Sequence, residues 1–258
     1  MSKIISVANQ KGGVGKTTTA VNLSACLAAK GKRVLMIDLD PQGNATSGLG
    51  IDKQSVKIST YDLLINEAPI NECLVKTEIE GLLVCPCNMR LAGAEVELVN
   101  LISRETRLKE AIIGIKKDYD YILIDCPPSL GLLTVNSLTA SDTVLVPIQC
   151  EYYALEGLGQ LMNTIKLIQK HLNRELEVEG VVLTMFDTRT NLSVQIVDEV
   201  RKHFNNKVYG TIIPRNVKLS EAPSFGKPII IYDPKSKGAE SYMDLADEVI
   251  MNGSETNE

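Results

Sequence analysis

The chain has 258 residues, of which 44% are hydrophobic and 23% charged, with a formal net charge of −5 at pH 7. This length is enough for one large α/β domain or two small ones with a buried core. No apolar run approaches the roughly 20 residues of a membrane-spanning helix, and a signal peptide is not expected because the first predicted strand begins at Ile4; we therefore expect a soluble protein.

A glycine-rich segment follows the first predicted strand, residues 4–8. Residues 10–18 match the phosphate-binding pattern G-x-x-x-x-G-K-[ST] except at its first position, where Gln10 replaces glycine. Lys16 can reach the β- and γ-phosphate oxygens, and Thr17 can offer its hydroxyl to Mg²⁺. The predicted ATP-binding residues of this loop are Lys11, Gly12, Gly13, Val14, Gly15, Lys16, Thr17 and Thr18.

The loop contains a second lysine, Lys11, which a single bound nucleotide does not need. On a loop this tight, its long cationic side chain can reach a phosphate bound by a second copy of the protein. After the loop, apolar residues recur at helical spacing over residues 20–28 and end at Gly31, a residue typical of a helix C-terminus. The sequence therefore predicts a strand, a phosphate-binding loop and a helix.

The rest of the chain alternates apolar strands with helical patterns. The predicted strands are residues 33–38, 82–86, 121–125, 143–148, 178–185 and 208–213, and the predicted helices are residues 105–115, 155–171, 193–204 and 239–251. This alternation predicts an α/β fold with a mostly parallel, twisted sheet and helices on both faces. We expect a single ATPase domain over residues 1–252, a polar tail over residues 253–258, and ligands at the carboxyl ends of the strands.

Aspartates end two of these strands. Asp38 and Asp40 stand at the end of the second strand, two residues apart and so on one side of the chain. Asp125 ends the run Tyr-Ile-Leu-Ile-Asp, where a carboxylate can hold Mg²⁺ through water. A strand-end aspartate can instead cap a turn. With the loop present, we expect Asp125 near the metal, Asp40 orienting the attacking water, and Asp38 as a further candidate metal ligand.

Six cysteines are scattered through the chain, and only Cys85 and Cys87 are close in sequence. This is neither a zinc spacing nor a secreted disulfide framework. We expect reduced cytosolic thiols that pack as small hydrophobic residues.

A basic stretch stands out against the acidic whole. Residues 201–240 contain eight Lys or Arg and three acids, a net charge of +5, which leaves −10 for the rest of the −5 chain. Such a field indicates either a polyanion-binding surface or an ordinary solvated face of mixed charge.

Several long segments resemble the ParA/Soj family of DNA-partitioning ATPases, the P-loop class with a deviant Walker A motif. They are the loop with Lys11, IDLDPQGNATSGLG at 37–50, ILIDCPPSLG at 122–131, VPIQCEYYALEGL at 146–158 and PRNVKLSEAPSFGKPIIIYDPKSKGAE at 214–240. The chain resembles the short chromosomal type, since no DNA-binding extension precedes the first strand.

The resemblance implies a nucleotide-sandwich homodimer with ATP and Mg²⁺ as cofactors. Lys11 would cross to the partner's phosphates and neutralise charge on the γ-phosphate, and Gly12 would permit close approach of the two loops. Lys11, Lys16 and Asp40 would be the catalytic residues. Pro214 and Asn216 match the family's adenine-recognition loop.

The Asn216 amide can offer both a donor and an acceptor to the base. Residues matching Arg189 and Lys218 contribute to sequence-independent DNA binding in Soj-like proteins. The resemblance therefore implies a cytoplasmic, nucleoid-associated switch that binds non-specific duplex DNA as an ATP-bound dimer. A ParB-type centromere-binding partner would stimulate hydrolysis and release, in chromosome or plasmid segregation, and a replication initiator is a further candidate partner.

Two other classes share this loop. A membrane-positioning ATPase resembling MinD would need a basic amphipathic carboxyl-terminal helix, whereas residues 241–251 are acidic, so we expect no membrane partner. A protein resembling nitrogenase reductase would hold an iron–sulfur cluster between protomers, with Cys87 and Cys126 as the strand-end thiols. The glycine-rich surroundings of such cysteines are missing, and a colourless purified protein would exclude this class.

Overall fold

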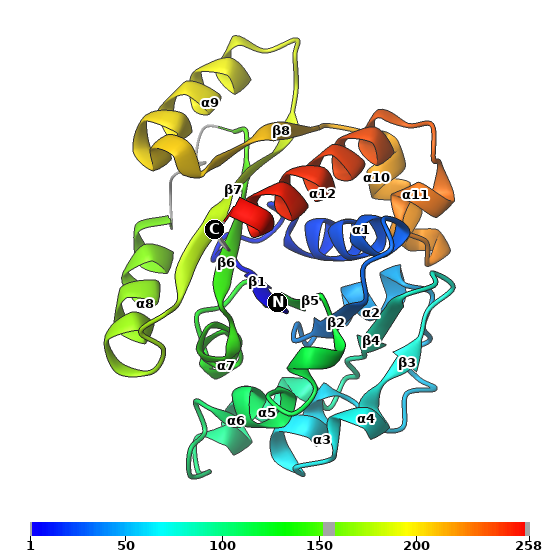
Figure 1. The fold of residues 1–258 in the computed structure, drawn as a ribbon, viewed down its shortest axis with the longest axis vertical. Coiled ribbons are helices and arrows are strands. Elements are labelled where there is room, and N and C mark those ends of the chain that lie inside the picture. Colours follow the sequence, from blue (N-terminus) through cyan, green and yellow to red (C-terminus); the bar gives the residue numbers. More distant parts are fainter. Residues whose placement is uncertain (1, 152–157, 256–258) are drawn as a thin grey trace.

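An eight-stranded sheet forms the centre of the molecule in the computed structural model, which describes residues 2–151 and 158–255 (Figure 1). The strand order is β3-β4-β2-β5-β1-β6-β7-β8. Every neighbouring pair is parallel except the antiparallel pair β3–β4. The strands are β1 (Lys3–Val7), β2 (Val34–Asp38), β3 (Val75–Lys76), β4 (Leu82–Cys85), β5 (Tyr121–Asp125), β6 (Thr143–Gln149), β7 (Glu177–Phe186) and β8 (Val208–Pro214).

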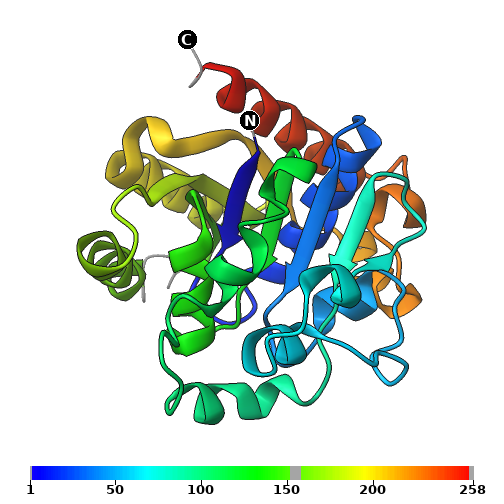
Figure 2. The same ribbon diagram turned by 60° about the horizontal axis from the view of Figure 1, so that its bottom comes forward.

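Helices cover both faces of this sheet (Figures 1 and 2). The described α-helices are α1 (Lys16–Ala29), α2 (Asn44–Gly48), α3 (Thr60–Ile65), α4 (Ile70–Cys73), α5 (Leu91–Leu98), α6 (Arg107–Ile112), α7 (Leu132–Ala140), α8 (Leu158–His171), α9 (Asn191–Phe204), α10 (Val217–Glu221), α11 (Ile229–Tyr232) and α12 (Lys237–Glu255). One core cluster joins α1, α11 and α12 to the sheet, a second joins α3, α5, α6 and α7, and a third lies between β6–β8 and helices α8 and α9.

The central strands β2 and β5 are apolar up to their terminal aspartates because helices cover them on both faces. Every residue of β2 and of β5 is buried, as is typical of parallel strands in α/β proteins. The register pairs Ile37 with Ile124 and Asp38 with Asp125. The two acidic strand ends therefore lie side by side at the carboxyl edge of the sheet.

The predicted fold class is confirmed, and the seven predicted strands are present with bounds that differ by at most one residue. The sequence missed the two-residue edge strand β3, the helix α7 and the short helices α2–α5, α10 and α11. The start of the predicted helix 155–171 lies outside the described residues.

At the carboxyl terminus, α12 continues to Glu255, so the first part of the segment expected as a polar tail is helical, and residues 256–258 lie outside the described part. Among the described residues, no helix combines the length and the apolar character needed to cross a membrane.

Candidate functional site

The phosphate-binding loop connects β1 to α1 and leaves the first turn of α1 without a side-chain cap. Gly15 occupies the N-cap position with φ 89°, a left-handed conformation that glycine adopts without the steric cost of a Cβ atom. The amide groups of the first helical turn are consequently available to an anion, and the helix dipole favours negative charge there. The expected role of this loop in binding a β-phosphate stays a prediction.

Two polar side chains hold this loop in place, one directly before it and one on β7. Asn9 donates from Nδ2 to the carbonyl oxygen of Pro147 at 2.7 Å and accepts from the amide of Lys11 at 3.0 Å. Thr184, on β7, donates its hydroxyl to the carbonyl oxygen of Val14 at 2.8 Å. The contacts of Asn9 with Pro147 and of Thr184 with Val14 could not be predicted from the sequence, because these partners are 138 and 170 residues away.

The two lysines of the loop are placed differently. Lys16 is buried and donates from Nζ to the carbonyl oxygen of Lys11 at 2.9 Å. Burial lowers the pKa of Lys16, and the negative charges of Asp125 and Asp40 oppose that shift. The Nζ atom of Lys11 makes no hydrogen bond or ion pair with any described residue. Lys16 thus points into the site of its own protomer, whereas Lys11 keeps an uncommitted cation.

Asp125 is fully buried, and neither of its carboxylate oxygens has a partner with hydrogen-bond geometry among the described residues. The hydroxyl of Thr17 lies near enough to lower its pKa, as does Lys16. Burial first, and the charge of Asp38 second, nevertheless raise the pKa of Asp125 well above the usual range of a carboxyl group. Buried polar atoms are normally satisfied, so this carboxylate has the geometry of a group whose partner is a ligand.

Both carboxylate oxygens of Asp38, unlike those of Asp125, accept hydrogen bonds. Its Oδ2 atom accepts the amide of Thr46 at 2.8 Å and the Thr46 hydroxyl at 2.6 Å, and its Oδ1 atom accepts the amide of Asp40 at 3.2 Å. Burial raises the pKa of Asp38 to about 6, and the hydrogen bonds from Thr46 and Asp40 act against that rise. The carboxylate therefore organises the segment from Asp40 to Thr46, and of the two paired aspartates Asp125 has the free oxygens.

Asp40 is buried beside Lys16 and Asp125, whose pKa values its charge affects. Its Oδ1 atom accepts the amide of Gln42 at 2.9 Å, and Lys53 donates to the carbonyl oxygen of Gln42 at 2.8 Å. These contacts fix the turn after β2 and hold the Asp40 carboxylate at the loop. The expected role of Asp40 in orienting water stays a prediction.

A cavity of about 270 Å³ joins the phosphate loop to the loop after β8. Its lining includes Gly15, Thr18, Thr184, Pro214, Asn216 and Tyr242. Asn216 caps α10, because its Oδ1 atom accepts the amide of Lys218 at 2.8 Å. An amide oxygen has two lone pairs and can accept a second hydrogen bond, so the expectation that Asn216 offers both its donor and its acceptor to a base stays a prediction.

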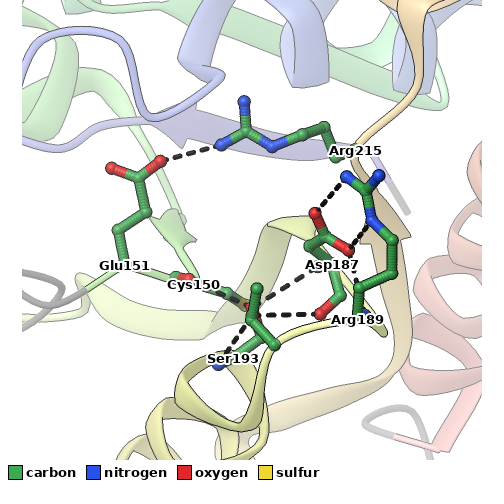
Figure 3. Close-up of polar contacts among 7 residues, drawn as sticks. Cys150, Glu151, Asp187, Arg189, Ser193 and Arg215 are labelled. Atoms are coloured by element: carbon green, nitrogen blue, oxygen red, sulfur yellow. Dashed lines mark hydrogen bonds and ion pairs between the residues drawn. The ribbon is translucent and has the colours of Figure 1, made fainter.

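The two predicted DNA-binding cations are exposed, and each is paired with an acid of its own protomer. Arg189 donates to both carboxylate oxygens of Asp187 at 2.9 and 2.7 Å (Figure 3). Lys218 donates to Glu221 at 2.9 Å and lies 5.7 Å from the ring centroid of Tyr232. Binding of a phosphate at either cation would replace an existing contact.

The basic stretch over residues 201–240 is partly neutralised in the fold. Three of its cations, Lys202, Lys207 and Arg215, pair with acids outside the stretch, and Lys218 and Lys237 pair within it. The net charge of +5 counted from the sequence therefore overstates the positive field of this stretch, since a count over residues 201–240 leaves out acids that pair with its cations from outside that range.

All six cysteines are free and buried. Cys126 donates its thiol hydrogen to the hydroxyl of Ser137 at 3.0 Å, and burial raises its pKa to about 12. Burial also raises the pKa of Cys87. Both thiols are thus disfavoured as thiolates, the form that ligates an iron–sulfur cluster.

Comparisons with known proteins find a matching family model and highly similar relatives. A family model described as an AAA domain matches residues 2–178. The sporulation initiation inhibitor protein Soj of Bacillus subtilis is 64% identical over 98% of this chain and 100% of its own length. The chromosome partitioning protein ParA of Myxococcus xanthus is 57% identical over 97% of this chain and 88% of its own length.

Among solved structures, cobyrinic acid a,c-diamide synthase of Mycobacterium smegmatis with bound ADP and magnesium has a TM-score of 0.87 and 39% identity, covering 98% of this chain and 96% of its own. The identity to the partitioning proteins is much higher over a similar share of the chain.

Proposed function

Because the chain belongs to the Soj/ParA family of chromosome-partitioning ATPases, we propose that it is an ATP-dependent switch whose dimer binds duplex DNA and releases it on hydrolysis. The observation that carries the nucleotide half of this proposal is the buried Asp125 carboxylate without a partner, next to Lys16 and the uncapped start of α1.

The residues at this position fit magnesium bound to a nucleotide. Thr17 and Asp125 supply oxygen atoms of the type that Mg²⁺ prefers, with Asp125 acting through water. No group of three or more His, Cys, Asp or Glu side chains in the described ranges is arranged to hold a metal alone, which suits an ion that takes its other ligands from phosphate and water. Bound there, Mg²⁺ would neutralise charge on the β- and γ-phosphates.

The other residues of the site have distinct tasks. The amides from Gly12 to Lys16 bind the β-phosphate, and the Lys16 ammonium leaves the carbonyl of Lys11 for the phosphate oxygens. Asp40 orients the attacking water. Asp38 holds the Asp40–Thr46 segment through its three hydrogen bonds, so we assign it a positioning role ahead of metal binding.

The dimer half of the proposal is supported by the surface of the loop. Gly12 is exposed, and a Cβ atom built there meets no atom within 4 Å, so a second loop can approach closely. The unpaired Lys11 cation then reaches the partner's γ-phosphate, where it stabilises charge that develops during hydrolysis. Turnover is therefore expected only in the dimer.

The DNA half rests on the exposed cations Arg189 and Lys218 and on the family. Binding through phosphates is insensitive to sequence and falls steeply with salt. A ParB-type partner would stimulate hydrolysis and so release the dimer from DNA, and a replication initiator is a further partner to test. This activity places the protein in the cytoplasm on the nucleoid.

The test is retention of the purified chain on non-specific duplex DNA at low and moderate salt, with Mg²⁺ and either ADP or a non-hydrolysable ATP analogue, together with its solution mass. We expect a dimer that binds DNA only with the analogue.

Arg189→Ala with Lys218→Ala should weaken DNA retention and leave ATP affinity unchanged, whereas the control pair Lys117→Ala with Lys166→Ala, two exposed lysines elsewhere, should retain DNA. A dimer that ignores DNA would refute the DNA half and direct attention to lipid vesicles.

A further inference from the structure

The carboxyl ends of β6, β7 and β8 bring four charged side chains together, and the function proposed above uses only one of them (Figure 3). Glu151 follows β6, Asp187 and Arg189 follow β7, and Arg215 follows β8. The last residues of β7 and β8, Phe186 and Pro214, are paired in register, and the amide of Arg215 donates to the carbonyl oxygen of Phe186 at 2.9 Å. Arg215 and Arg189 therefore leave the sheet from adjacent strand ends.

Each arginine of this cluster is turned toward an acid (Figure 3). Arg215 donates from Nη2 to Oε1 of Glu151 at 2.8 Å, across 64 residues of sequence, and both side chains are about half exposed, at 53% and 48%. Arg189 makes its paired contact with Asp187. The hydrogen bonds from Arg189 hold the pKa of Asp187 well below its usual range, and the charge of Arg215 lowers that pKa further. Both guanidinium groups are therefore close enough to Asp187 to affect the same carboxylate.

We propose that Arg215 is a further DNA-phosphate-binding residue of this surface and that Glu151 competes with DNA for it. The inference rests on the proposed DNA binding and adds to it a residue and an intramolecular competitor. As it stands, the cluster of two arginines and two acids is neutral. Exchange of the carboxylates for backbone phosphates would present both guanidinium groups to the duplex and return both acids to water.

The physical chemistry favours this exchange at Arg215. An ion pair between half-exposed side chains contributes little, because water and salt screen it and both side chains lose freedom. A backbone phosphate can accept two hydrogen bonds from the same planar guanidinium group, and phosphates occur at high density along a duplex. Glu151 therefore lowers DNA affinity moderately without preventing binding.

The position of Arg215 also connects this surface to the nucleotide. Arg215 stands between Pro214 and Asn216, which line the cavity shared with the phosphate loop, and it lines that cavity too. A base bound beside Pro214 and Asn216 fixes the backbone on either side of Arg215. The same short loop thus contacts the nucleotide cavity on one side and carries a DNA contact on the other.

The first experiment compares Glu151→Gln with the wild type, as full chains with Mg²⁺ and a non-hydrolysable ATP analogue, by titration onto non-specific duplex DNA. Freeing Arg215 from an exposed ion pair should tighten DNA binding about two- to five-fold per protomer. The matched control is Glu177→Gln. It removes the same charge and breaks an ion pair with Lys207, at the opposite end of β7, and should raise affinity less than Glu151→Gln.

The second experiment removes the cation. Arg215→Gln should weaken DNA binding and reduce the slope of log Kobs against log salt by about 0.9 per protomer, the value for one lost phosphate contact. The double variant Glu151→Gln with Arg215→Gln should bind as weakly as Arg215→Gln alone, because Glu151 acts only through Arg215. A gain of affinity in Glu151→Gln cannot result from misfolding, which keeps the test valid even where Arg215→Gln is impaired.

Three results would overturn the inference while leaving the proposed function intact: equal affinities of Glu151→Gln and Glu177→Gln, a gain that persists in the double variant, or an unchanged salt slope in Arg215→Gln. A gain of Glu151→Gln on vesicles of phosphatidylglycerol and phosphatidylcholine but not on duplex DNA would also overturn it, because the phosphate bound would belong to lipid. If the wild type with the analogue binds no DNA, the proposed function itself fails, and the inference with it.

Discussion

The Asp125 side chain has an unfavourable environment in the protein without a bound ligand. It is completely buried, and neither of its oxygens has a partner with hydrogen-bond geometry among the described residues, although the Thr17 hydroxyl and Lys16 lie near enough to lower its pKa. A buried charge without a partner opposes folding, and its raised pKa expresses that cost. A bound ligand that pairs with such a carboxylate offsets this cost. We therefore expect Asp125 to destabilise the free protein and to favour binding of the Mg²⁺-nucleotide.

Asp125→Asn should therefore stabilise the free protein and abolish hydrolysis. Removing the unpaired charge should raise the free energy of unfolding in urea, without nucleotide or Mg²⁺, by about 1–3 kcal/mol. The stabilisation that Mg²⁺ and the ATP analogue give to the wild type should be lost in the variant. Asp198→Asn, at an exposed position on α9, is the control and should change neither quantity. A variant less stable than the wild type would contradict the idea that Asp125 is unpaired.

The side-chain hydroxyl of Thr46 makes two buried hydrogen bonds. Its hydroxyl donates to Asp38 and accepts the amide of Cys87 at 2.9 Å. Thr46→Val keeps the side-chain shape but leaves a buried amide and a carboxylate oxygen with lost partners, so the free energy of unfolding should fall by about 1–3 kcal/mol. Thr164→Val removes a hydroxyl whose contact is exposed and should cost far less. Equal urea midpoints for the two variants would show that the Thr46 network does not stabilise the fold.

At the scale of elements, the contact of α2 with the 3₁₀ turn at Ala222–Phe225 depends on a close backbone approach. A Cβ atom at Gly226, where φ is +63°, would lie 2.9 Å from Cα of Gly50 and 3.2 Å from the carbonyl oxygen of Ser47. Helix α2 and this turn both lie beside the phosphate-binding loop, because both line a cavity that also includes Thr17 and Thr18.

Gly226→Ala should consequently destabilise the protein by more than its backbone conformation alone requires. The control is Gly31→Ala, where φ is +79° and a Cβ atom meets nothing within 4 Å, so it measures only the left-handed penalty of about 1–2 kcal/mol. We expect Gly226→Ala to exceed that loss in thermal or urea unfolding. A smaller loss at Gly226 than at Gly31 would mean that the two loops separate without cost.

The elements that the sequence revealed are those whose burial produces a pattern along the chain. Parallel central strands such as β2 and β5 are buried on both faces and read as continuous apolar runs ended by aspartate. Helix α7 was not predicted because it is buried on nearly all sides and includes Thr134, Asn136 and Ser137 among its buried residues. Its sequence therefore shows no alternation of apolar and polar faces. The strand β3 has only two residues, too few for any periodicity.

The residues of the candidate site likewise fall into those that the sequence could predict and those that it could not. The loop residues and strand-end aspartates could be predicted because their spacing follows from local backbone geometry. The contacts of Thr46 with Cys87, Thr184 with Val14 and Asn9 with Pro147 could not, since each joins residues that are far apart in sequence and that the fold brings together. Pairing of Arg189 with Asp187 is local in sequence, but the pairing of Arg215 with Glu151 needs β6 and β8 on either side of β7.

At the scale of the whole molecule, one edge of the sheet carries every group of the proposed switch. The phosphate loop follows β1, Asp40 follows β2, Asp125 ends β5, and Arg189 and Arg215 follow β7 and β8. Ligands in open α/β sheets bind at the carboxyl ends of the strands. Nucleotide, second protomer and DNA are thus proposed to act on adjoining loops, so a change at one loop has a short path to the others.

The dimer at the centre of this scheme can be tested without disturbing the fold. Gly12→Val adds side-chain bulk at an open, exposed position, so thermal stability and binding of a fluorescent ATP analogue should match the wild type. If two loops must meet at Gly12, the solution mass with Mg²⁺ and the non-hydrolysable analogue should remain that of a monomer, and DNA retention and ATP turnover should be lost together. Gly114→Val, at another exposed glycine whose Cβ position is open, is the control and should dimerise normally. A Gly12→Val protein that dimerises and hydrolyses ATP would show that the loops do not meet there, and Lys11 would lose its proposed route to the partner's phosphates.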